Sequence, residues 1–266
     1  MSADVRTDAR RLLEGKQYDA RHQTWEAAHE LGSPIYSFRR SLILKLLPKE
    51  GESLYFLDVG CGTGDYARAL LERGHQVDAI DISESAVQEA VKRVPERLRS
   101  RFHARVGDFS QLGQRARYNG IICSEVLEHV QDDEALLRQL HTLLLPRGSL
   151  ILSVPADPAL WSQDDDFSGH VRRYTREELV SKLTKAGLTV ESLWSYGFPI
   201  LRIYTWIKTK LLHGDTAKVV SSHNQGLGKV LLHFAALTVN ALVWILDRHL
   251  LCQRKGIGFV AQCRKA

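Results

Sequence analysis

The chain has 266 residues, of which 44% are hydrophobic and 25% are charged. This composition is typical of a soluble globular protein and argues against a disordered chain. The net charge of +5 is uneven, because residues 196–266 contain ten lysines or arginines and two acids, a balance of +8 that leaves −3 for the rest. The four cysteines lack C-x-x-C spacing and the first eleven residues lack an apolar run. We therefore expect reduced thiols, no signal peptide and a cytoplasmic protein.

A strand, a glycine turn and a helix form the most informative stretch of the sequence. Asp58 follows an apolar run at 54–57, and three alternate glycines come after it: Gly60, Gly62 and Gly64. Such glycines let the backbone approach a ligand at a helix N-terminus. Asp65 stands where a pyrophosphate would approach in a dinucleotide-binding loop, and the lysine of a P-loop is missing. The spacing therefore favours a ligand that carries positive charge.

Strands and helices alternate along most of the chain. The expected strands cover residues 54–59, 75–82, 102–106, 118–123, 149–154, 188–196 and 258–263. Helical patterns follow several of them, at 65–73, 83–94, 132–144 and 175–187. This alternation predicts an α/β fold with a seven-stranded, doubly wound sheet.

The motif D-x-G-x-G-x-G at the end of the first strand resembles the cofactor loop of class I S-adenosylmethionine-dependent methyltransferases. The resemblance covers about residues 50–195 and the final strand, and it implies a Rossmann-like fold. It implies that Asp58 lies near the ammonium and sulfonium end of the cofactor. Asp108 would meet the adenine amino group and Phe109 would pack beside the ring. Ile82 and Ser124 would complete the cofactor-binding residues.

Asp81 ends the second strand, about 20 residues beyond the glycines. In nucleotide-binding sheets, an acid at this place accepts hydrogen bonds from the ribose hydroxyls. The alternative is that Asp81 only caps the helix that follows, a task that Ser83 could perform instead.

A second motif, E-x-x-E-H, follows the fourth strand with Glu125, Glu128 and His129. On the first turn of a helix, offsets of three and four residues would place Glu128 and His129 beneath Glu125. The motif resembles those of two metal-dependent branches of the superfamily, the small-RNA 2′-O-methyltransferases and the O-methyltransferases of ubiquinone biosynthesis. In the RNA branch a later histidine completes the site, and His170 has the comparable place.

These four residues would suit Mg²⁺, Mn²⁺ or Fe²⁺. Two alternatives stay open. His129 could act as a base without a metal, with Glu125 as a second catalytic residue, or the motif could be structural. Arg172 and Arg173 could clamp an anionic acceptor, or one of them could pair with an acid such as Asp165.

The chain divides into three parts on this interpretation. Residues 1–50 would form a helical lid with Tyr18 and Trp25 as candidate lid residues, or else helices simply packed on the domain. The methyltransferase core would comprise residues 51–197 and 256–266, and a helical cap would comprise residues 198–255. The cap contains an apolar run at 230–246, which we expect to be a buried cap helix, a dimer contact or a membrane-surface helix rather than a transmembrane span.

The sequence thus predicts an S-adenosylmethionine-dependent methyltransferase that acts on a small or lipid-like acceptor, at oxygen, with peripheral membrane contact and a homodimer as open alternatives. One rival is a metal-dependent RNA ribose 2′-O-methyltransferase. We do not expect nucleic-acid binding, because the basic C-terminal region alternates with apolar runs rather than with stacking aromatics. The other rival is a protein that binds S-adenosylmethionine but catalyses another reaction, such as a cyclisation.

Overall fold

The computed structural model describes residues 33–211, 243, 245–246, 251 and 255–266. Tyr18, Trp25 and most of the apolar run at 230–246 lie outside the described residues. Within the described ranges, every helix is too short or too polar to cross a bilayer.

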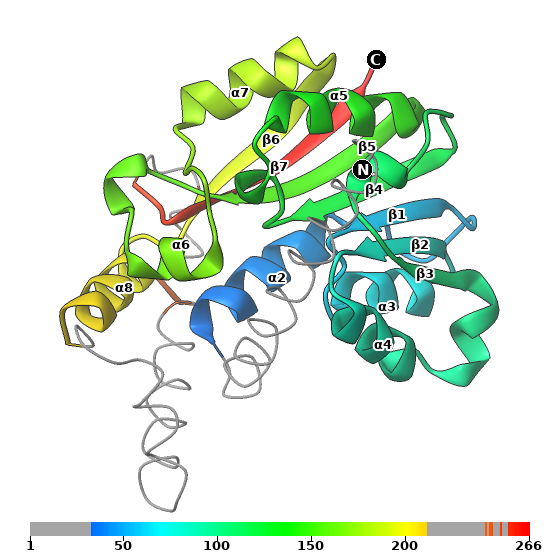
Figure 1. The fold of residues 1–266 in the computed structure, drawn as a ribbon, viewed down its shortest axis with the longest axis horizontal. Helices are drawn as coiled ribbons and strands as arrows, with labels where there is room; N and C mark the ends of the chain where they lie inside the picture. Colours follow the sequence, from blue (N-terminus) through cyan, green and yellow to red (C-terminus); the bar gives the residue numbers. More distant parts are fainter. Residues whose placement is uncertain (1–32, 212–242, 244, 247–250, 252–254) are drawn as a thin grey trace, which may run out of the picture.

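In the described part of the chain, seven strands form one sheet (Figure 1). They are β1 (Tyr55–Val59), β2 (Gln76–Asp81), β3 (Phe102–Val106), β4 (Tyr118–Ser124), β5 (Leu144–Pro155), β6 (Leu188–Tyr196) and β7 (Gly258–Lys265). Their order is β3-β2-β1-β4-β5-β7-β6, and β7 is antiparallel to both of its neighbours. The predicted doubly wound sheet is confirmed. The strand order reverses between β1 and β4, which is where sheets of this kind bind ligands.

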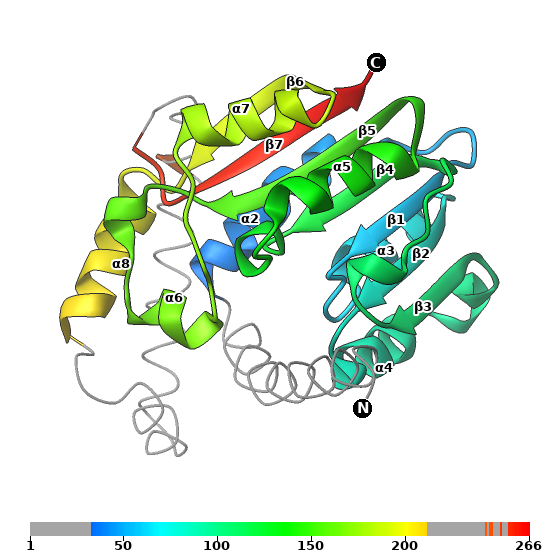
Figure 2. The same cartoon turned by 45° about the horizontal axis from the view of Figure 1, so that its top comes forward.

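Helices cover both faces of the sheet, as Figures 1 and 2 show. On one face lie α2 (Pro34–Leu46), α3 (Asp65–Glu72) and α4 (Glu84–Arg93), and on the other lie α5 (Asp133–Leu143) and α7 (Arg176–Lys185). The short α6 (Gln163–Ser168) and α8 (Ile200–Leu211) lie next to each other beyond the carboxyl ends of the central strands. Each face of the sheet buries its own apolar cluster. Because the central strands are covered on both faces, their sequences are apolar at successive positions.

β5 differs from the expectation, because it begins at Leu144 instead of Ser149. The expected turn at 146–148 is an irregularity inside the strand. The register against β4 shifts between Tyr118 and Gly120, and Arg147 takes a positive φ of 63°. Bulges of this kind keep a strand paired while accommodating extra residues.

Candidate functional site

The three glycines after β1 have different roles. All three take positive φ, 67° at Gly60, 51° at Gly62 and 80° at Gly64. A Cβ would collide with Val126 at Gly60 and press against Ala90 at Gly64, but at Gly62 it would meet no heavy atom within 4 Å. Two glycines therefore allow close packing of the loop, and Gly62 leaves its backbone open to a ligand. The loop leads into α3, whose first residue is Asp65.

Asp81 ties the glycine loop to the end of β2. One carboxylate oxygen accepts a hydrogen bond from the Gly62 N–H at 2.8 Å, and the other accepts one from the Ser83 N–H at 2.9 Å. The cap of α4 is Ser83, whose hydroxyl accepts from the Ala86 N–H at 3.0 Å. Asp81 is therefore not needed as the cap, and its half-buried carboxylate lies at the open part of the loop.

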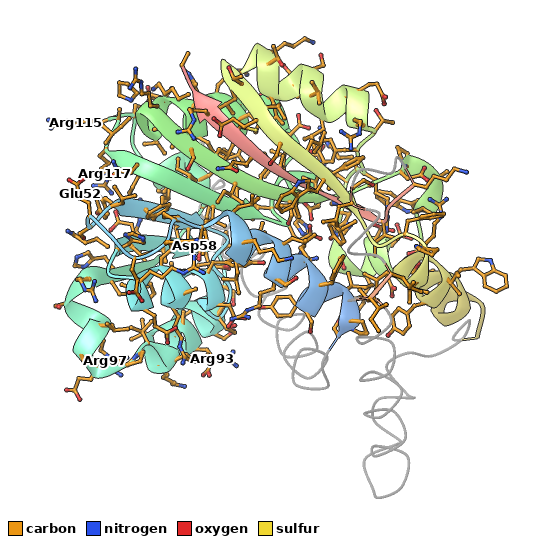
Figure 3. The ribbon with its side chains drawn as sticks, turned by 180° about the vertical axis from the view of Figure 1, so that it is seen from behind. Glu52, Asp58, Arg93, Arg97, Arg115 and Arg117 are labelled. Carbon is orange, nitrogen blue, oxygen red and sulfur yellow. The ribbon has the colours of Figure 1, made fainter. Side chains whose placement is uncertain are left out.

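Asp58 is a buried acid without a matching cation among the residues that the structure describes. Only 1% of its surface is exposed, and within the described part of the chain neither carboxylate oxygen has a hydrogen-bond partner. The Ala67 N–H lies near enough to lower its pKa without reaching hydrogen-bond geometry. Burial, with smaller contributions from Asp81 and Asp65, raises the pKa of Asp58 to about 8. Figure 3 shows Asp58 inside the molecule near the end of β1, where a cationic ligand group would satisfy it.

The remaining residues expected to bind the cofactor follow neighbouring strands at the same edge. Asp108 comes just after β3, and it accepts a hydrogen bond from the Ser110 N–H at 2.8 Å. Phe109 is half-buried and packs against the core. Ile82 directly follows β2, and Ser124 ends β4 with its hydroxyl 2.9 Å from that of Ser153. Parallel strands thus bring these residues to one edge of the sheet.

The E-x-x-E-H motif is not one helical turn, so its predicted helical placement is wrong. Glu125 takes a positive φ of 55°, and only Leu127–His129 form a 3₁₀ turn, η3. The Glu125 N–H donates to the Ser153 carbonyl at 3.0 Å, which continues the pairing of β4 with β5 by one residue before the chain turns. The side chains of Glu125 and Glu128 consequently have different partners.

Glu125 pairs with Arg39 of α2, at 2.9 Å between Oε2 and Nη1. Its other oxygen accepts a hydrogen bond from the Ser153 hydroxyl at 2.9 Å. Burial alone would lower the pKa of Arg39, but Glu125 and Tyr196 raise it. On the same helix, the Tyr36 hydroxyl donates to Asp65 at the start of α3. Arg39 was not predicted from the sequence, in which the only signal is that Tyr36 and Arg39, three residues apart, share one face of an amphipathic helix.

Glu128, His129 and His170 come together, and in the described ranges they form the one group that could hold a metal ion. One ligand atom from each lies within 4.8 Å of the others. The Glu128 side chain is fully buried, and neither of its oxygens has a hydrogen-bond partner among the described residues. His170 Nε2 lies 3.9 Å from Glu128 Oε1, and the Val171 N–H donates to the Glu128 carbonyl at 2.9 Å.

The donor set suits a divalent cation. His129 Nδ1 lies 3.3 Å from the Gly169 carbonyl, which can only accept, so Nδ1 carries the hydrogen and Nε2 keeps its lone pair. Burial and the nearby Glu125 raise the pKa of Glu128 well above its ordinary value. A buried carboxylate is costly unless a cation or a donor satisfies it. Ligand atoms that share one ion lie roughly 3 to 4 Å apart. The three side chains, whose ligand atoms lie within 4.8 Å of one another, would therefore have to move only slightly closer together to bind an ion.

Arg172 and Arg173 both have acidic partners in the structure. Arg173 forms two hydrogen bonds with Asp165, at 2.8 and 2.9 Å, and Arg172 lies 2.8 Å from Asp133. Burial alone would raise the pKa of Asp165, but hydrogen bonds from His170 and Arg173 lower it to about 2. The structure therefore shows the acid pairing that the sequence analysis gave as the alternative to an anion clamp.

Comparisons with known proteins agree with this fold. The family described as "Methyltransferase domain" matches residues 33–193. A ubiquinone biosynthesis O-methyltransferase from Leptothrix cholodnii is 34% identical over 104 residues, which cover 38% of this chain and 44% of that protein. Its namesake in Coxiella burnetii is 35% identical over 100 residues, 37% of this chain and 42% of that protein. The matches thus span less than half the length of these relatives.

Solved structures show the same fold at low sequence identity. A geranyl diphosphate C-methyltransferase from Streptomyces coelicolor A3(2), in complex with Mg²⁺, geranyl diphosphate and S-adenosyl-L-homocysteine, has a TM-score of 0.60 at 14% identity, covering 87% of this chain and 81% of that chain. The [4+2]-cyclase SpnF has a TM-score of 0.56 at 20% identity, covering 85% and 80%.

The sheet order and the glycine loop define a Rossmann-like methyltransferase fold. The family match covers more than half of the chain. The chain therefore belongs to the class I S-adenosylmethionine-dependent methyltransferase family. The cofactor of this family is S-adenosylmethionine.

Asp58 gives a pH-dependent prediction for cofactor binding. With a pKa of about 8 in the free protein, Asp58 is mostly protonated at neutral pH. A cofactor ammonium beside it would favour the charged form, so binding of S-adenosylhomocysteine at about pH 7 should release up to about one proton. This contribution should strengthen binding as the pH rises towards 8. Calorimetry in two buffers of different ionisation enthalpy measures the release, and Asp58→Asn should lack it. Equal proton release by both proteins would contradict this role of Asp58.

The Arg39–Glu125 pair gives a stability prediction. Glu125→Gln removes the charge that balances a mostly buried guanidinium, so we expect a loss of about 1 to 3 kcal/mol in the free energy of unfolding. The matched control is Glu72→Gln, because the Arg68–Glu72 pair is exposed and its loss should cost less than about 0.5 kcal/mol. Urea denaturation measures both values. Similar losses in the two variants would show that the buried pair does not anchor α2.

Proposed function

We propose that this protein transfers a methyl group from S-adenosylmethionine to a hydroxyl oxygen of a small or lipid-like acceptor. The observation that carries the proposal is the Glu128, His129 and His170 group, which lies beyond the carboxyl end of β4, beside residues suited to the cofactor. Its fully buried Glu128 carboxylate lacks a hydrogen-bond partner among the residues described. The names of the matched relatives, ubiquinone biosynthesis O-methyltransferases, support oxygen as the methylated atom.

The cofactor would be held along the edge formed by β1, β2, β3 and β4. We assign its ammonium and sulfonium end to Asp58, its ribose to Asp81 and its adenine to Asp108 and Phe109. Ile82, Ser124 and the glycine loop would line the rest of its site. When bound, S-adenosylmethionine supplies an already activated methyl group, so the chain mainly has to align the acceptor and exclude water.

Glu128, His129 and His170 would hold a divalent metal. Such an ion lowers the pKa of a hydroxyl bound to it, which prepares the oxygen for methylation. Glu125 is held by Arg39 and Ser153, so it would line the site next to these three residues and would not coordinate the ion. The metal-free alternative keeps His129 as the base, because Nε2 carries the lone pair in the tautomer that the Gly169 carbonyl favours.

The three-part organisation gains support from α2 and α8. Side chains of α2 contact Asp65 and Glu125 at the site, as expected of the lid proposed for residues 1–50. In α8, Ile203 is 51% exposed and Trp206 is 63% exposed, and the neighbouring α6 carries the exposed Phe167. These apolar side chains favour a lipid-like acceptor or peripheral membrane contact through the proposed cap at 198–255. A homodimer stays a prediction from the sequence.

The two rival functions are cyclisation and RNA ribose methylation. The fold alone does not separate a methyltransferase from a cyclase, since both kinds of protein share it with this chain. The names of the matched relatives and the buried Glu128 favour methyl transfer to oxygen over cyclisation. RNA ribose methylation would require the basic C-terminal region to bind RNA, with strong salt dependence.

The test is methyl transfer from labelled S-adenosylmethionine to a panel of catechols, vicinal diols and a 3′-terminal ribose. We expect the full chain to methylate a catechol or diol, and Glu128→Gln to lower kcat by about 100-fold or more because the buried ligand charge is lost. Binding of S-adenosylhomocysteine should stay within about threefold of wild type.

The control variant is Glu134→Gln, which removes an exposed carboxylate of α5 that pairs only at the surface with Arg138. It should keep full activity. Wild-type activity in Glu128→Gln would remove Glu128 from the mechanism, and methylation of the ribose alone would favour the RNA rival.

A further inference from the structure

Asp165 is almost completely buried, with 1% of its surface exposed, and both of its oxygens accept hydrogen bonds. Oδ2 accepts from the Ser162 N–H at 2.8 Å and from Arg173 Nη2 at 2.9 Å. Oδ1 accepts from Arg173 Nε at 2.8 Å and lies 2.8 Å from His170 Nδ1. A single carboxylate therefore joins the start of α6, Arg173 and one histidine of the candidate metal group.

The local sequence fixes the distance between Asp165 and His170. Ser162 and Asp165 form a reciprocal capping box at the start of α6. Gly169 ends the helix in a left-handed conformation, φ 74°, and the His170 N–H then donates to the Asp165 carbonyl at 2.9 Å. Both ends of α6 are thus capped, and the imidazole of His170 is held against the carboxylate of Asp165.

This contact determines which nitrogen of His170 carries the hydrogen. An ionised carboxylate can only accept, so a neutral His170 has to donate from Nδ1. Its Nε2 then presents a lone pair 3.9 Å from Glu128 Oε1. Two acceptors facing each other in a buried site repel unless a proton or a metal cation lies between them.

We infer that Asp165 is a positioning residue, which fixes the Nδ1–H tautomer of His170 and so presents Nε2 as a ligand beside Glu128 and His129. The inference rests on the proposed metal site, and it adds an outer residue to that site. Carboxylates that orient metal-binding histidines in this way typically contribute 10- to 100-fold to metal affinity.

Asp165→Asn tests this because the fixed donors favour one orientation of the amide: the Oδ2 position faces two, the Ser162 N–H and Arg173 Nη2, and the Oδ1 position faces one, Arg173 Nε. Its oxygen should take the Oδ2 position, where Ser162 and Arg173 donate, which leaves its NH₂ group facing His170 Nδ1. Nδ1 then has to accept, and the hydrogen moves to Nε2. That tautomer cannot bind a metal through Nε2.

The experiment is two-bond ¹H–¹⁵N correlation spectroscopy of histidine in the full chain without metal, at about pH 8.5, roughly two units above the ordinary pKa of the histidine side chain. The His170 signal is assigned by its absence in His170→Gln. We expect the Nδ1–H tautomer in wild type and the Nε2–H tautomer in Asp165→Asn. Calorimetric titration with Mn²⁺ alone should show at least tenfold weaker binding to Asp165→Asn than to wild type.

Two controls separate positioning from stability. Ser162→Ala removes a capping hydroxyl 3.2 Å from Asp165, and Asp166→Asn changes an exposed acid whose side chain accepts a hydrogen bond from Trp161 Nε1. Ser162→Ala should lower the melting temperature, and both variants should keep the His170 tautomer and Mn²⁺ affinity of wild type.

An Nε2–H tautomer in wild type would overturn the inference without any variant. So would an unchanged tautomer in Asp165→Asn. If wild type has the Nδ1–H tautomer but binds no Mn²⁺, the positioning contact stands and the proposed metal site fails.

Discussion

The site depends on carboxylates that the fold buries near the carboxyl ends of its central strands. Asp165 is fully satisfied by Arg173, Ser162 and His170, whereas Asp58 and Glu128 have no hydrogen-bond partner in the described residues. Leaving a buried carboxylate unsatisfied costs stability unless the group is protonated or a ligand supplies the missing charge. Asp58 and Glu128 thus indicate two places for positive charge, which we propose to be those of the cofactor and of a metal.

Two segments outside the central strands complete this arrangement. α2 brings Arg39 to Glu125 and Tyr36 to Asp65, so it contacts both the end of β4 and the helix after the glycine loop. The segment from α6 to His170 lies on the other side of the site, where it places an oriented imidazole next to Glu128. The acceptor and the cofactor would therefore meet between elements that are held by buried ion pairs rather than by apolar packing alone.

Much of the fold could be predicted from the sequence, because apolar runs that end at glycine, proline or acidic residues mark buried parallel strands. The β3 and β6 bounds are confirmed to the residue. The placement of Glu125 could not be predicted, since nothing local in the sequence indicates a left-handed glutamate after a strand. The partners of Arg39 and Asp165 depend on which elements meet in space. His170 was expected beside the E-x-x-E-H motif only through resemblance, and it does lie next to Glu128.

The measurement that tests the account most directly is the divalent metal content of the purified full chain, determined by elemental analysis after equilibration with Mg²⁺, Mn²⁺ and Fe²⁺. We expect about one ion per chain in wild type and less than about a tenth of that in Glu128→Gln, because a buried ligand charge is lost. S-adenosylhomocysteine should bind equally to both proteins. A wild-type protein that binds S-adenosylhomocysteine tightly but holds no metal would contradict the metal site and leave His129 as a base acting alone.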